Sequence, residues 1–160
     1  MRSLVRTAML ASVCALLAPA VGLSAQANPP AKSTWNLNLA KSNFGGGPAP
    51  KSVTVNAETL PNGTKFDIQG VGADGKPFTI RYTSTTDGKE FPVTGSANYD
   101  TEVGRRIDST TTEMTRKKAG KVVETATNVI SNGFKVATVT IKGTDAKGKK
   151  YARVEVYERQ

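Results

Sequence analysis

The chain has 160 residues, with 22 Lys or Arg against 13 Asp or Glu, a formal net charge of +9, one cysteine and no histidine. The lack of histidine removes the commonest general base and the commonest metal ligand, and one cysteine cannot build a disulfide framework within the chain. We therefore expect a protein that is not an enzyme and holds no metal and no cofactor, while its basic balance favours anionic partners.

The first 27 residues have the three parts of an export signal. Basic Arg2 and Arg6 precede an apolar stretch from Ala8 to Leu23, and small residues follow at Ala25 and Ala27. A membrane anchor is the alternative, but the apolar stretch is interrupted and shorter than the ~20 residues that span a bilayer. We expect cleavage after residue 27, a single domain over residues 28–160, and a periplasmic or secreted location.

From Trp35 onward, short segments alternate apolar and polar residues, which is typical of strands with one buried face. The apolar positions of the first four segments are Trp35, Leu37 and Leu39, then Val53, Val55 and Ala57, then Phe66 and Ile68, then Phe78, Ile80 and Tyr82. Turn signals separate the segments at Pro61-Asn62-Gly63, Asp74-Gly75, Asp87-Gly88, Gly120, Asn132-Gly133 and Gly148. The pattern predicts an all-β chain of about ten antiparallel strands.

Three segments depart from plain alternation. The glycine- and proline-rich run from Gly45 to Pro50 predicts a long first connection, Phe91-Pro92-Val93 predicts a short or edge strand, and Thr94 to Tyr99 predicts a loop. A meander of this many strands tends to curl or close on itself. We expect a small 8–10 stranded β-barrel, with a two-sheet β-sandwich as the alternative that strand count cannot exclude.

Two resemblances follow from these residues. Trp35-Asn36-Leu37-Asn38, Gly47-Pro48-Ala49-Pro50 and Phe91-Pro92-Val93-Thr94-Gly95 resemble small exported bacterial proteins of unknown function, a likeness that implies no activity. In architecture the chain resembles lipocalins, avidins and fatty-acid-binding proteins, which carry a tryptophan on the first strand and an arginine on the last. That resemblance implies that Arg153 lies across the indole of Trp35 and that the barrel holds a ligand.

Candidate polar groups for the interior come from the second half of the chain. Val103, Arg105 and Ile107 share one strand face, and Thr112, Met114 and Arg116 share another, so inward-pointing faces would bring Arg105 and Arg116 inside. On the last strand, the simpler interpretation packs Ala152, Val154 and Val156 inward. The alternative turns Arg153 and Tyr157 inward, where they resemble the Arg-x-Tyr pair with which fatty-acid-binding proteins hold a carboxylate.

These observations lead to two hypotheses. In the first, the barrel binds a small apolar or amphipathic molecule, and the candidate ligand-binding residues are Trp35, Phe66, Phe78, Tyr82, Arg105, Arg153 and Tyr157. In the second, a filled barrel binds an anionic envelope surface through a basic rim made of Lys117, Lys118, Lys121, Lys147, Lys149 and Lys150. We disfavour nucleic acid because no aromatic residues interleave with these lysines, and we expect a monomer.

Catalysis has little support in the sequence. Asp100 and Glu102 could form a carboxylate pair, but residues two apart on a strand share a face by geometry alone. We therefore retain binding as the expected activity.

Overall fold

The computed structural model describes residues 30–145 and 147–160. The expected signal over residues 1–27 lies outside the described residues. The described chain forms ten strands, which are β1 (Lys32–Leu37), β2 (Ser52–Leu60), β3 (Gly63–Val71), β4 (Pro77–Ser84), β5 (Asp87–Pro92), β6 (Thr101–Arg106), β7 (Thr111–Lys118), β8 (Lys121–Ser131), β9 (Val136–Thr144) and β10 (Lys150–Arg159).

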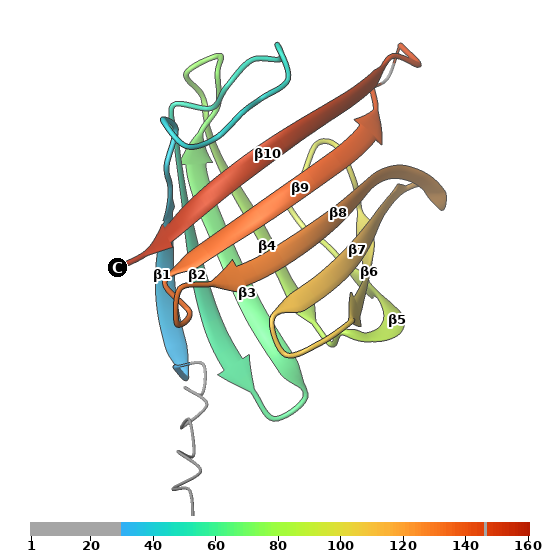
Figure 1. The fold of residues 1–160 in the computed structure, drawn as a ribbon. Helices are drawn as coiled ribbons and strands as arrows, with labels where there is room; N and C mark the ends of the chain where they lie inside the picture. Colours follow the sequence, from blue (N-terminus) through green and yellow to red (C-terminus); the bar gives the residue numbers. More distant parts are fainter. Residues whose placement is uncertain (1–29, 146) are drawn as a thin grey trace, which may run out of the picture.

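All ten strands belong to one antiparallel sheet in the order β4-β3-β2-β1-β10-β9-β8-β7-β6-β5. Apart from β4 and β5, which stand at the two ends of this order, strands that follow each other in sequence lie side by side. The first strand joins the last, with Trp35 opposite Arg159 and Leu37 opposite Tyr157. In Figure 1, β8, β9 and β10 cross obliquely in front of β2, β3 and β4 as the sheet curls round. The predicted antiparallel meander is therefore confirmed, and it forms a nearly closed barrel instead of a two-sheet sandwich.

The two ends of the sheet, β4 and β5, meet through a single short contact. Arg81 on β4 and Thr94 after β5 exchange backbone hydrogen bonds of 3.0 Å in both directions. The predicted edge strand is confirmed, because β5 ends the sheet order and contains Pro92, which has no N–H to donate to a further strand. This seam is the least hydrogen-bonded part of the barrel wall.

The tightest apolar packing lies just inside this seam. Buried Phe91 and Tyr99 cluster with Val93 and are covered by Ile80, Tyr82 and Val123. The Tyr82 ring stacks on Phe91 with centroids 5.8 Å apart and contacts the Phe66 ring at 5.0 Å. Because these rings come from β3, β4 and β5, they join the two ends of the sheet from the inside.

The connections follow the predicted turns with one exception. The glycine- and proline-rich run lies in the long β1–β2 connection, and Asn132 and Gly133, both with positive φ, form the β8–β9 turn. The hairpin expected at Asp87-Gly88 is wrong. The chain turns one pair earlier, where Thr86 has a φ of 50°, and Gly88 instead lies in β5 beside a register shift, an arrangement typical of a β-bulge.

Candidate functional site

A row of residues on the inner surface of the barrel runs across six strands and contains three charged side chains. Residues directly opposite each other on antiparallel strands share a face, so register pairs trace this row from strand to strand. From β5 to β10 the row contains Phe91, Glu102, Arg116, Glu124, Gly143 and Tyr151. Since Phe91 belongs to the buried cluster, the whole row faces the interior.

Five charged side chains form an alternating chain that we call the inner polar network. Arg116 binds Glu102 through Nε at 2.8 Å and Glu124 through Nη1 at 2.9 Å. Arg153 binds the other oxygen of Glu124 at 3.0 Å and Glu155 at 2.8 Å. The network therefore runs Glu102, Arg116, Glu124, Arg153, Glu155, with a carboxylate at each end.

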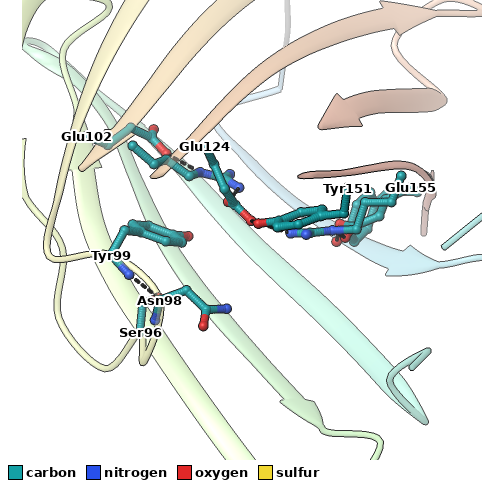
Figure 2. Close-up of polar contacts among 10 residues, drawn as sticks. Ser96, Asn98, Tyr99, Glu102, Glu124, Tyr151 and Glu155 are labelled. Atoms are coloured by element: carbon teal, nitrogen blue, oxygen red, sulfur yellow. Dashed lines mark hydrogen bonds and ion pairs between the residues drawn. The ribbon is translucent and has the colours of Figure 1, made fainter. Parts of the chain in front are cut away.

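Tyrosines surround the inner polar network. Tyr151 donates its hydroxyl hydrogen bond to Glu124, and Tyr157 donates to Glu155 at 2.8 Å. The guanidinium of Arg116 lies 4.8 Å from the centre of the Tyr99 ring, a cation–π contact. Figure 2 shows Tyr99 beside the line that Glu102, Glu124 and Tyr151 form, with Glu155 at its far end.

One glycine makes the Tyr151 contact possible. Tyr151 and Glu124 lie on strands that are separated by β9, and the residue between them in the row is Gly143. A Cβ atom at Gly143 would lie 2.5 Å from the Tyr151 hydroxyl oxygen. The missing side chain therefore lets the tyrosine ring cross β9 and reach the carboxylate.

The charges of the network stabilise one another. Burial by itself raises the pKa of Glu124, but the nearby guanidinium groups of Arg116 and Arg153 and the hydroxyl of Tyr151 outweigh it and hold that pKa below its usual range. Burial opposes the charge of Arg116, yet Tyr99 and the two carboxylates raise its pKa well above the usual value. Glu124 and Arg116 therefore hold their opposite charges at neutral pH without help from a ligand.

The tyrosines stay neutral beside these charges. Burial is the main cause that raises the pKa of Tyr82 and Tyr157 well above the usual value, and it also raises the pKa of Tyr99 and Tyr151. Their hydroxyl groups therefore keep their protons and remain available as hydrogen-bond donors at neutral pH.

One end of the network has an oxygen with no partner. The Glu102 side chain is 0% exposed, and its Oε1 atom accepts no hydrogen bond, while its Oε2 atom binds Arg116. The Oδ1 atom of Asn128, on the same face of β8 as Glu124, is also buried without a partner. Buried oxygens of this kind call for a donor, which a water or a ligand can supply.

Opposite the network, β1–β4 supply what we call the apolar wall. Register pairs place Trp35, Val55, Ile68 and Ile80 in one row, and Ala57, Phe66 and Tyr82 in the next, with Val53 and Phe78 further along. Of these only Val53 is buried, and each of the others keeps part of its surface exposed. The apolar wall is therefore not fully covered by other side chains.

The structure separates the residues that the sequence proposed as ligand contacts. Trp35, Phe66, Phe78 and Tyr82 lie on the inner face of β1, β3 and β4. Arg153 and Tyr157 also lie inside, in contact with the inner polar network. Their role as ligand contacts stays a prediction.

Three expectations about side-chain direction are wrong. Arg105 is exposed on the outer face of β6, because Glu102 and Gly104 take the inner face. On β10 the polar residues point inward, since Arg153 and Tyr151 find buried Glu124, so Ala152 and the valines do not form the inner face. Arg153 lies over Tyr151 at 5.3 Å instead of Trp35, which is opposite Arg159, roughly 20 Å along the strand from Arg153.

Sequence reasoning missed most of the carboxylates. Glu102 entered only as part of a pair with Asp100, which instead binds the backbone N–H of Ala119, and Glu124 was not singled out. The simpler interpretation of the last strand, which packs the valines inward, would place Glu155 on the outer face.

The predicted basic rim lies at one end of the barrel. In a meander, the β7–β8 and β9–β10 connections fall at the same end, so Lys118 and Lys149 are not at opposite ends. Lys117 pairs with Glu90, whereas the other five rim lysines are exposed and make no ion pair within the described residues. Lys118 and Lys121 stand directly opposite each other.

Comparison with family models, with curated proteins and with solved structures gives no match for this chain. Among residues 30–145 and 147–160 there is no helix long and apolar enough to cross a membrane. The same described residues contain no group of three or more acidic side chains arranged to hold a metal ion. The nearly closed ten-stranded barrel is consistent with a calycin-like architecture.

Proposed function

We propose that the chain is a non-catalytic barrel protein that holds a small apolar or amphipathic molecule against its apolar wall. The observation that supports this most is the partial exposure of inward-facing Trp35, Phe66 and Ile68. In a solidly packed core such side chains would be covered by their neighbours. A ten-stranded barrel is also wider than the eight-stranded size at which side chains just fill the interior.

The chemistry of the polar side supports binding over catalysis. Each arginine of the inner polar network already bridges two carboxylates, and the pKa of Glu124 is lowered by Arg116 and Arg153 despite its burial. A general acid at neutral pH needs the opposite shift. The network is therefore suited to present fixed charges and hydrogen bonds, and less suited to transfer protons.

Export is part of the proposal. It rests on the basic, apolar and small-residue segments within residues 1–27 and on the resemblance to small exported bacterial proteins. Mass spectrometry of the protein recovered from its native envelope tests this directly. We expect a first residue at Asn28, and an N-terminus that retains residues 1–27 would contradict export by cleavage.

The binding proposal is tested on protein purified gently from its own envelope. Native mass spectrometry should show added mass from a co-purifying molecule, and the neutral dye Nile red should gain fluorescence on entering the barrel. Trp35 is the only tryptophan of the chain and faces the interior, so its emission should change on binding. Neither added mass nor uptake of the dye would refute the proposal.

A pair of variants localises the binding. Val55→Tyr adds bulk to the inner face of β2, whereas Thr54→Tyr adds the same group to the outer face of the same strand. We expect Val55→Tyr to reduce uptake of Nile red at least several-fold and Thr54→Tyr to leave it unchanged. Equal effects of the two substitutions would indicate that the dye binds outside the barrel.

A second candidate function is attachment to an anionic envelope surface through the basic rim. The unpaired lysines and the direct opposition of Lys118 and Lys121 favour it, since like charges in a cross-strand pair are destabilising. The double variant Lys118→Glu/Lys121→Glu should lose binding to phosphatidylglycerol vesicles. The control variant Lys65→Glu/Lys135→Glu should retain vesicle binding. It makes the same change of charge at two exposed lysines at the opposite end of the barrel.

A further inference from the structure

The inner polar network has one carboxylate more than it has guanidinium groups. Its ion pairs use Arg116 twice and Arg153 twice, and they join three glutamates, so two guanidinium groups face three carboxyl groups and the formal charge of the network is −1. The tyrosines beside it are neutral, because burial raises their pKa. The inner polar network is thus formally negative, whereas Arg106 and Arg159 also lie on the inner faces of β6 and β10 and the whole chain has a formal charge of +9.

This balance disfavours an anionic ligand at the inner polar network. A carboxylate head group would have to compete for Arg116 and Arg153 with glutamates that already hold them at 2.8 to 3.0 Å. It would also add a second uncompensated negative charge to a partly desolvated space. The hydroxyl of Tyr157, which the resemblance assigned to carboxylate binding, is already used by Glu155.

The excess charge is least compensated at the Glu102 end. Glu124 has two arginines and a tyrosine hydroxyl, and Glu155 has Arg153 and Tyr157, whereas Glu102 has Arg116 alone and keeps a buried oxygen without a donor. A buried carboxylate in this state is stabilised by any additional donor or cation.

Aromatic rings surround the same end. Phe91 lies directly opposite Glu102 in the sheet, and the Tyr99 ring lies against the guanidinium of Arg116, which binds Glu102. Phe91 stacks on Tyr82, which contacts Phe66 on the apolar wall. A carboxylate beside aromatic rings favours the binding of an ammonium group. Apolar side chains continue from this end of the network to the apolar wall.

We propose that the barrel ligand is a cationic amphiphile, with an ammonium head at the Glu102 end of the inner polar network and an apolar tail along the apolar wall. This inference rests on the proposed binding function and narrows its ligand class. The head would supply both a donor for the Glu102 Oε1 atom and the missing positive charge.

The first test compares head groups on one tail. Dodecylammonium, dodecanol and laurate are titrated below their micellar concentrations against the full chain, and binding is followed by calorimetry and Trp35 emission. We expect dodecylammonium to bind roughly tenfold or more tighter than laurate, with dodecanol between them. The net positive charge of the chain favours the opposite order, so surface attraction cannot produce this preference. Laurate binding as tightly as dodecylammonium would overturn the inference.

The second test removes the charge. Glu102→Gln should weaken dodecylammonium roughly tenfold and leave dodecanol nearly unchanged, while Glu113→Gln, which neutralises an exposed glutamate on the outer face of β7, should change neither. An unchanged affinity for dodecylammonium in Glu102→Gln would also overturn the inference. If that variant does not fold, the head-group series on the unaltered chain decides alone.

The two proposals fail in different ways. Uptake of Nile red without any preference for the ammonium head would refute the cationic ligand and leave the binding function intact. No uptake of Nile red and no binding of any dodecyl probe would refute the binding function itself.

Discussion

Replacing Arg116 by methionine tests the energetic role of the inner polar network. Arg116 is 9% exposed and neutralises Glu102 and Glu124, whose side chains are 0% and 1% exposed. Removing one partner of a buried ion pair costs about 3–5 kcal/mol, because the other charge stays buried and uncompensated. Glu124 keeps Arg153, so we expect the lower end, about 3 kcal/mol, which corresponds to a fall in Tm of about 10 °C for a domain of this size.

Urea unfolding followed by circular dichroism measures this cost, and Arg105→Met is the control. Arg105 is exposed on the next strand, so its loss should stay within about 0.5 kcal/mol. The double variant Arg116→Met/Glu102→Leu removes the stranded charge together with its partner and should recover at least half of the loss. A cost below about 1 kcal/mol for Arg116→Met, or a double variant as unstable as the sum of its parts, would refute the reasoning.

Three further predictions concern pH, packing and salt. The folded-state pKa of Glu124 lies below the ordinary value of 4.5, so the unfolded chain binds a proton at a higher pH than the folded chain does. The stabilisation that Glu124 contributes should therefore be complete above pH 4.5 and should decline as pH falls through the folded-state pKa. Glu124→Gln should remove this acid-side dependence from a plot of unfolding free energy against pH. Gly143→Ala should push Tyr151 off Glu124 and cost about 1–3 kcal/mol in urea unfolding. Raising salt from 50 to 500 mM should release the chain from phosphatidylglycerol vesicles, if the basic rim holds it there, while uptake of Nile red changes little. If salt abolished both vesicle binding and Nile red uptake, or neither of them, the two kinds of binding would not be separate.

The fold could be predicted because the first four strands carry a clear signal. Trp35 and Leu37 alternate with polar residues, and the same holds for Phe66, Ile68 and their partners, so one face must be buried. Pro92 predicted the sheet edge for an equally simple reason, since proline cannot donate a hydrogen bond. The hairpin predicted at Asp87-Gly88 is wrong because a dipeptide of this kind suits a β-bulge as well as a tight turn, so its presence does not locate a turn by itself.

The direction of the later strands could not be read in the same way. On β6 the apolar residue Val103 accompanies Arg105 on the outer face, and the inner face carries Glu102 and Gly104. The rule that apolar side chains face inward fails wherever the interior is itself polar. On β10 the same rule chose the valines, although Arg153 and its neighbours are compensated by glutamates on other strands.

The missing information was the cross-strand pairing, and the predicted turns contain part of it. Arg116 and Glu124 lie on either side of the turn at Ala119-Gly120, but plain pairing from Lys118 and Lys121 would set Arg116 against Val123. A register shift between Arg116 and Lys117 places Arg116 opposite Glu124 instead. The β8–β9 turn has four residues between Ser131 and Val136, and it places Glu124 opposite Gly143, over which Tyr151 reaches it. Opposite charges across a turn do not by themselves indicate an inner face, because Arg105 stands opposite Glu113 across the β6–β7 turn and both lie on the outer face. The register of each strand pair, with its bulges, is what separates Arg116 from Arg105, and the alternation of residue types along the sequence does not contain it.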